Sequence, residues 1–158
     1  MIDQADDDER EYTLSPLTDS LGFLTRVVQV QINDRVRASG GLGRSPAVLC
    51  LLQLVEANPG IRQVDAARIL LIQESNMANL IKDLIAQGLI KRRGKNGGKR
   101  GGLLITQHGR RRVEQATSGA PIDRAYAAVL SDKDYQRLVT MLSLLYRAAL
   151  KFPSGRLE

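Results

Sequence analysis

The residues with the clearest chemistry are the lysines and arginines between Leu89 and Val113. This stretch contains nine basic residues and no aspartate or glutamate. Solubility alone is normally served by mixed charges, so an acid-free run favours a polyanionic partner. Its apolar ends, Leu89-Ile90 and Leu103-Leu104-Ile105, enclose glycine, asparagine and basic residues, a pattern typical of a β-hairpin with a cationic tip. Six residues of this hairpin are expected to contact DNA: Lys91, Arg92, Arg93, Lys95, Lys99 and Arg100.

A second candidate surface precedes the hairpin. Between Glu74 and Gln87 the apolar residues recur every three or four positions, which predicts an amphipathic helix that stops at Gly88. A shorter helix is expected over Arg62–Leu70. Two short helices with a tight connection are typical of a helix-turn-helix, whose second helix enters the major groove. Amide, hydroxyl and ammonium groups can read base edges or bind phosphates. The contacts expected here are Gln73, Ser75, Asn76, Asn79 and Lys82. For this helix alone, the alternative is an ordinary solvated face.

Four further helices must support these surfaces. The apolar spacing predicts an amphipathic helix over Leu17–Val36, and the apolar run Ala47–Val55 predicts a helix buried on most sides. Thr106 is expected to cap the helix after the hairpin. The segment Ser131–Asp134 resembles a capping box and starts a final amphipathic helix, Tyr135–Leu150. A small lobe cannot cover the apolar faces of the first and last helices, so a twofold dimer is expected.

The composition fits one domain with a charged extension. The chain has 158 residues, 43% of them hydrophobic and 4% aromatic, so its core must consist of aliphatic side chains. Residues 1–11 carry a net charge of −5 and the remainder +11. We expect residues 1–14 to be a disordered acidic leader; the alternative is an intramolecular mimic that competes with DNA. Residues 15–152 form the expected domain, with dimerisation helices at about 15–38 and 121–151 and a DNA-binding lobe at about 45–110.

The other candidates for chemistry, His108 and Cys50, do not indicate an enzyme. One histidine cannot make a multi-histidine metal site, and no nucleophile motif accompanies His108, so an exposed or capping role is expected. Cys50 is expected to be a small core hydrophobe; the alternative is a redox-sensing thiolate. A single cysteine excludes an internal disulfide. No signal peptide or long apolar run is visible, which favours the cytoplasm. No catalysis, cofactor or metal is expected.

Three segments together carry a resemblance to a known family. They are Q-V-D-A-A-R-I-L at Gln63–Leu70, N-L-I-K-D-L-I-A-Q-G-L-I-K-R-R at Asn79–Arg93, and L-L-I-T-Q-H-G-R at Leu103–Arg110. In this order and spacing, from about Leu17 to Leu150, the chain resembles the MarR family of bacterial transcriptional regulators. The resemblance implies a fold that is mainly α with a small β-hairpin wing, a winged helix-turn-helix with N- and C-terminal dimerisation helices.

The resemblance also implies partners, and the chain departs from the family's pattern at two points. The implied partners are a second copy of the chain, a pseudo-palindromic double-stranded operator and a small-molecule effector, for which no residues are assigned. The wing sequence G-G-K-R-G at Gly97–Gly101 lacks the family's bracing aspartate, which leaves Arg100 as the expected groove-inserting residue. The turn Leu70-Leu71-Ile72 lacks the usual glycine.

The pattern therefore favours a sequence-specific DNA-binding regulator, a repressor relieved by a small-molecule or redox signal. One alternative is a sequence-indifferent nucleic-acid or architectural protein that uses only the basic wing. Another is an interaction module whose basic face docks an acidic protein. Affinities for a promoter duplex and a scrambled duplex would separate these functions.

Overall fold

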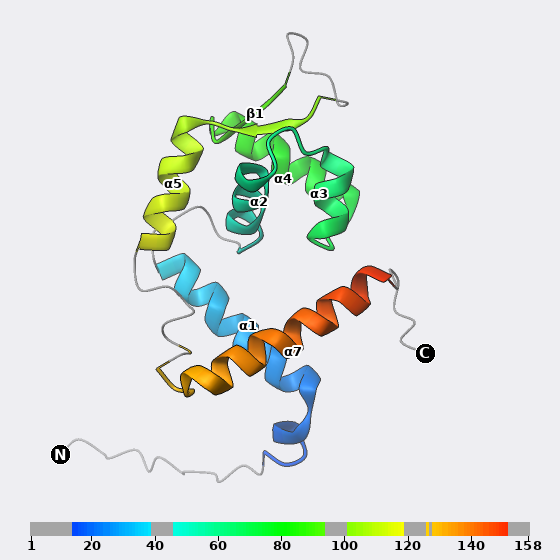
Figure 1. The fold of residues 1–158 in the computed structure, drawn as a ribbon, viewed down its shortest axis with the longest axis vertical. Helices are drawn as coiled ribbons and strands as arrows, with labels where there is room; N and C mark the ends of the chain where they lie inside the picture. Colours follow the sequence, from blue (N-terminus) through cyan, green and yellow to red (C-terminus); the bar gives the residue numbers. More distant parts are fainter. Residues whose placement is uncertain (1–13, 39–45, 94–100, 119–125, 127, 152–158) are drawn as a thin grey trace, which may run out of the picture.

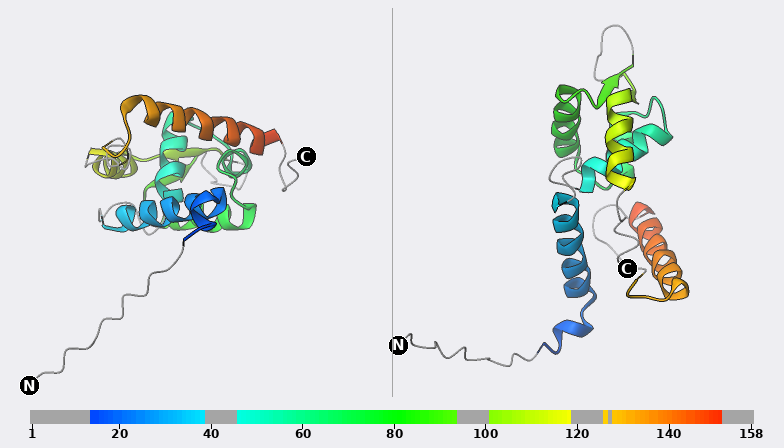
Figure 2. Two further views of the ribbon diagram at one scale, coloured as in Figure 1. Left: turned by 90° about the horizontal axis from the view of Figure 1, so that it is seen from below. Right: turned by 90° about the vertical axis from the view of Figure 1, so that its left-hand side faces the viewer.

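The computed structural model describes residues 14–38, 46–93, 101–118, 126 and 128–151. Figure 1 shows a compact lobe that ends in the hairpin, and Figure 2 shows the two long helices, α1 and α7, standing apart from each other on the opposite side of the lobe. The fold is mainly α with one small antiparallel sheet, as expected. The elements are η1 (Leu17–Asp19), α1 (Leu21–Ala38), α2 (Pro46–Ala57), α3 (Gln63–Ile69), α4 (Glu74–Ala86), β1 (Ile90–Arg92), β2 (Leu103–Ile105), α5 (Gln107–Ser118) and α7 (Asp132–Lys151).

The core of the lobe forms where α2 packs between α5, α3 and the sheet. From α2 the buried residues are Val48, Leu51, Leu52 and Val55, one stripe at helical spacing. The expectation that this helix is buried on most sides is therefore wrong for the single chain, since Cys50 on its other side is exposed. The remaining buried side chains include Met77, Ile81, Leu84, Ile90 and Leu103.

The turn between α3 and α4 is a Schellman motif with leucine in the place of glycine. The Ile72 N–H donates to the Ala67 carbonyl at 2.9 Å and the Leu71 N–H to the Arg68 carbonyl at 3.3 Å. Leu71 has a φ of 52°, in the left-handed region that costs most L-residues about 1–2 kcal/mol. Leucine in place of glycine therefore strains this turn, but the turn is still a Schellman motif.

The end of α4 uses the same motif with a glycine. Gly88 has a φ of 68°, its N–H donates to the Ile85 carbonyl, and the Leu89 N–H donates to the Leu84 carbonyl. Leu84 and Leu89 are both buried, which supplies the apolar contact typical of the motif. This turn leads directly into β1, so the end of α4 sets where the hairpin starts.

The hairpin is an antiparallel pair in which Ile90 faces Ile105, Lys91 faces Leu104 and Arg92 faces Leu103. Leu103 also bridges Ile61, in the connection between α2 and α3. At this edge Gly102 lies so close to the backbone of Gly60 that a Cβ atom there would collide with it. The base of the wing is thus held to the lobe by backbone contacts of β2 and of the glycine that precedes it.

Thr106 links α5 to the start of the hairpin and confirms the expected cap. Its hydroxyl accepts a hydrogen bond from the Gly109 N–H at 3.0 Å and donates to the Gly88 carbonyl at 2.6 Å. A Cβ atom at Gly109 would collide with the Leu89 carbonyl oxygen. The sequence Thr-x-x-Gly therefore packs the first turn of α5 directly on the junction between α4 and β1.

The two long helices, α1 and α7, differ in how well the sequence predicts them. The expected helix from Leu17 is interrupted, since η1 is a 3-10 turn and Ser20 is extended before α1 starts at Leu21. The correction follows from Ser20, whose hydroxyl accepts the Phe23 N–H and so caps α1. The final helix begins at Asp132, and its Ser131 cap accepts the Asp134 N–H at 3.2 Å, as the capping box predicts.

Candidate nucleic-acid interface

The outer face of α4 carries the side chains expected to read DNA. Ser75, Asn76, Asn79 and Lys82 are exposed on this helix, and Gln73 is exposed immediately before it. The opposite face is held in the core by Met77, Ile81 and Leu84. We call α4 the recognition helix and the two strands with their connection the wing. The recognition helix can therefore present amide, hydroxyl and ammonium groups to a groove without unpacking.

The wing residues divide into three groups. Lys91 and Arg93 are exposed at the end of β1, as expected. Arg92 is half-buried, and its Nη2 donates to the Oε1 of Gln63 at 2.9 Å. Lys95, Lys99 and Arg100 lie outside the described residues.

Sequence reasoning missed the bond between Arg92 and Gln63. The two residues are far apart along the chain, so no local pattern marks them as partners. The bond joins the base of the wing to the first residue of α3. It therefore ties the wing to the helix-turn-helix.

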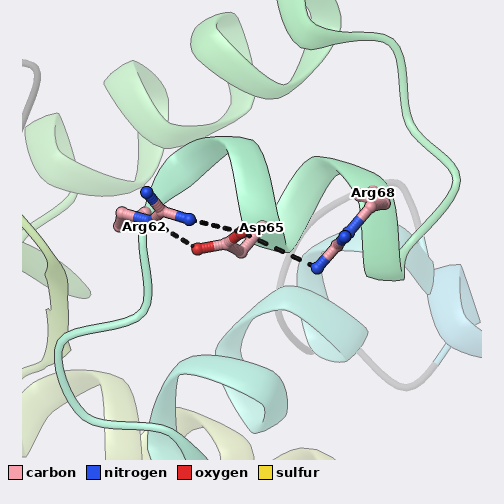
Figure 3. Close-up of polar contacts among 3 residues, drawn as sticks. All are labelled: Arg62, Asp65 and Arg68. Atoms are coloured by element: carbon pink, nitrogen blue, oxygen red, sulfur yellow. Dashed lines mark hydrogen bonds and ion pairs between the residues drawn. The ribbon is translucent and has the colours of Figure 1, made fainter.

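A cluster of ion pairs on α3 was also missed. Figure 3 shows Asp65 between Arg62 and Arg68. The Nε of Arg62 lies 2.6 Å from one Asp65 carboxylate oxygen, and its Nη2 donates to the other at 3.0 Å. The Nη2 of Arg68 lies 3.8 Å from that carboxylate. The hydrogen bond from Arg62 lowers the pKa of Asp65. The negative charge of Asp65 is thus offset by its arginine neighbours. The i,i+3 spacing of these residues in the sequence was the signal that could have predicted the ion pairs.

The two other candidate residues show no sign of chemistry. His108 is exposed in the first turn of α5, as expected. Part of Cys50 is open to solvent, but desolvation of its sulfur raises the pKa of the thiol. A redox-sensing cysteine needs a lowered thiol pKa, so its surroundings act in the wrong direction. Within the described residues, no three histidine, cysteine, aspartate or glutamate side chains gather as metal ligands.

The helix-turn-helix, its Schellman turn and the wing together identify the lobe. The family model of the MarR family matches residues 42–101. Residues 42–101 of the lobe therefore resemble a MarR-family domain. A search of curated protein sequences finds no match.

Solved structures extend the similarity beyond residues 42–101. The transcriptional repressor CouR bound to a 23-mer DNA duplex is 23% identical, with a TM-score of 0.75 over 85% of this chain and 98% of that one. CouR bound to p-coumaroyl-CoA is 23% identical, with a TM-score of 0.72 over 87% and 99%. The PcaV regulator from Streptomyces coelicolor, in complex with its natural ligand, is 20% identical, with a TM-score of 0.71 over 88% and 98%. At these identities the likeness is one of fold, and it covers the long helices as well as the lobe.

Proposed function

We propose that this protein is a homodimeric, sequence-specific repressor that binds double-stranded DNA and is released by a small molecule. The observation that carries the proposal is the exposed polar face of the recognition helix beside an acid-free cationic wing. On this proposal Gln73, Ser75, Asn76, Asn79 and Lys82 contact the major groove. Lys91, Arg93 and the wing residues outside the described part, Lys95, Lys99 and Arg100, contact the backbone or the minor groove.

The charges of the domain support a nucleic-acid partner. Net charge beyond the first 11 residues is +11, and the only acid on α3 is paired with arginine. The proposed role of Arg92 is indirect, because its hydrogen bond to Gln63 holds the wing against α3. If each of the two subunits neutralises about five phosphates, a plot of the logarithm of the dimer's binding constant against the logarithm of salt concentration has a slope of about −9.

The uncovered helices support the dimer. Among the described residues, the buried core contains none from α1 or α7, although both carry large apolar side chains. Leu21 on α1 is 64% exposed and Leu144 on α7 is 60% exposed. Figure 2 shows α1 and α7 outside the lobe, on the side away from the wing. A second copy can cover these faces and place two recognition helices about 34 Å apart, one turn of DNA.

The similar structures support control by a ligand, since CouR binds p-coumaroyl-CoA and PcaV binds its natural ligand. The raised thiol pKa of Cys50 removes the support for the redox alternative. None of the described helices is long and apolar enough to cross a membrane. We infer a cytoplasmic, non-enzymatic protein with dimerisation segments at about 15–38 and 121–151 and a DNA-binding lobe at about 45–110.

The first test asks whether the recognition helix reads bases. A duplex is selected from a randomised library with the wild-type protein, and its Kd is compared with that of a scrambled duplex by fluorescence anisotropy. Asn79→Ala should relax the preference by about 1–3 kcal/mol at one base position in each half-site. Gln115→Ala, an amide removed from the exposed face of α5, is the matched control. An unchanged preference in Asn79→Ala would remove Asn79 from the interface.

The second test asks whether Lys82 contacts a DNA phosphate or only adds to the overall positive charge of the protein. Lys82→Ala should weaken binding to all duplexes and reduce the salt slope by about 1 for each subunit. Lys133→Ala on α7 removes the same charge from an exposed position away from the lobe. If the two variants behave alike, overall charge and not a phosphate contact drives binding. If the selected and scrambled duplexes bind equally, the sequence-indifferent alternative replaces the repressor.

A further inference from the structure

The C-terminal half of α7 reaches back to the DNA-binding lobe at one specific point. The hydroxyl of Tyr146 donates a hydrogen bond to the main-chain carbonyl of Ile69 at 2.9 Å. Ile69 is the last residue of α3, the first helix of the helix-turn-helix. In Figure 1, the C-terminal end of α7 lies on the side of the lobe where α3 is found. One side chain on a long helix thus binds the backbone just before the turn to the recognition helix.

This carbonyl is one of two at the end of α3, with that of Leu70, for which the turn supplies no backbone hydrogen bond. A helix ends with four carbonyls that lack intrahelical partners, and a Schellman motif satisfies only some of them. The carbonyls of Ala66, Ala67 and Arg68 accept the N–H groups of Leu70, Ile72 and Leu71. The carbonyl of Ile69 accepts the hydroxyl of Tyr146. The tyrosine therefore completes the C-terminal cap of α3 from a different helix.

This bond is a polar contact that holds α7 to the lobe. No described residue of α7 is buried, and Tyr146 itself is 40% exposed, so apolar packing within the subunit fixes α7 weakly. On the other side of the bond, the turn is tied to the core by the half-buried Ile72 and to α3 by the hydrogen bonds of Leu71 and Ile72. A shift of α7 at Tyr146 is therefore transmitted to the start of α4.

We propose that Tyr146 is a positioning residue that sets the orientation of the recognition helix relative to the dimerisation helices. In the dimer that orientation decides how far apart, and at what angle, the two recognition helices meet the DNA. The bond thereby selects the spacing between the two half-sites of the operator. This inference rests on the proposed function and adds to it the residue that determines the spacing between the two half-sites.

The test compares Tyr146→Phe, which removes only the hydroxyl, with Tyr126→Phe. The hydroxyl of Tyr126 lies 3.5 Å from the Val28 carbonyl and 3.4 Å from Oε1 of Gln31, so it contacts α1 and not the lobe. Both variants are measured as dimers, verified by sedimentation. The probes are the selected duplex, the same duplex with one base pair inserted between the half-sites, and a single half-site. The insertion turns one half-site by about 34° relative to the other.

Wild type and Tyr126→Phe should discriminate against the inserted base pair by at least about tenfold. Tyr146→Phe should lose about threefold to tenfold of that discrimination, the range expected for one hydrogen bond, and bind the single half-site like wild type. Equal discrimination by all three proteins overturns the proposal. So does a loss of half-site binding as large as the loss of discrimination, since the bond would then only stabilise the lobe.

Amide hydrogen exchange in the free dimer tests the bond without DNA. The N–H groups of Leu71 and Ile72 should exchange about threefold to tenfold faster in Tyr146→Phe, and that of Leu89 at the wild-type rate. If no duplex can be selected, the proposed function fails and exchange alone decides whether the bond exists. Unchanged exchange at Leu71 and Ile72 in that variant overturns the bond itself, whatever the protein binds.

Discussion

Replacing Thr106 by valine removes one hydroxyl and almost preserves the shape of the side chain. That hydroxyl accepts the N–H of Gly109 at 3.0 Å and donates to the carbonyl of Gly88 at 2.6 Å, with the Leu89 carbonyl at 3.1 Å as a second acceptor. Loss of an N-cap costs about 1 kcal/mol, and loss of a further hydrogen bond costs about 1 kcal/mol. Thr106→Val should therefore lower the free energy of unfolding by about 2 kcal/mol.

The assay is urea denaturation followed by circular dichroism, at a fixed protomer concentration because the dimer makes stability concentration-dependent. For a protein of this size, about 2 kcal/mol corresponds to a Tm lower by about 4–8 °C. Thr106→Ser keeps the hydroxyl and is the matched control, expected to lie within about 1 kcal/mol of wild type. If serine and valine destabilise equally, the lost methyl packing and not the hydroxyl explains the result, and the linking role of Thr106 is refuted.

Three further predictions concern backbone and charge. Leu71→Asn should be more stable than Leu71→Val by at least about 1 kcal/mol in the same denaturation assay, because asparagine tolerates a positive φ and a β-branched residue does not; equal stabilities would contradict the strain at this turn. Gly109→Ala should lower the free energy of unfolding by about 1–3 kcal/mol, because its Cβ would collide with the Leu89 carbonyl, although alanine normally favours helices; a stabilised variant would contradict the contact. Because the native pKa of Asp65 is lowered, its ion pair contributes stability above the ordinary aspartate pKa and loses it as pH falls through the native pKa. Asp65→Asn should thus be less stable than wild type near pH 7, with a difference that closes below about pH 4; a constant difference would assign the effect to something other than charge.

Local signals in the sequence predicted the elements of the DNA-binding lobe well. The spacing of Met77, Ile81 and Leu84 identified the buried face of α4, and Thr106 and Gly88 identified a helix start and a helix end, since caps and apolar periodicity act within a few residues. The same rules carried the helix too far at Leu17, because the spacing of four between Leu17 and Leu21 fits an α-helix and does not reveal that Ser20 between them is extended.

Long-range and solvent-dependent features were not predictable in the same way. An apolar run such as Ala47–Val55 does not show which side faces the core, so Cys50 was placed inside although only the stripe from Val48 to Val55 is buried. The bonds of Arg92 with Gln63 and of Tyr146 with Ile69 join residues whose proximity only the fold creates. The left-handed leucine in the α3–α4 turn shows that a missing glycine need not change the type of turn.

On the proposed function, the recognition helix and the wing together read a DNA sequence. The most direct measurement is the ratio of the dissociation constants for the scrambled and the selected duplex at physiological salt, with the wild-type dimer. Specific regulators bind their sites at least about 10³-fold more tightly than other DNA, and a ratio of that size is predicted here. A ratio near one would contradict sequence-specific recognition, even if both duplexes bind tightly.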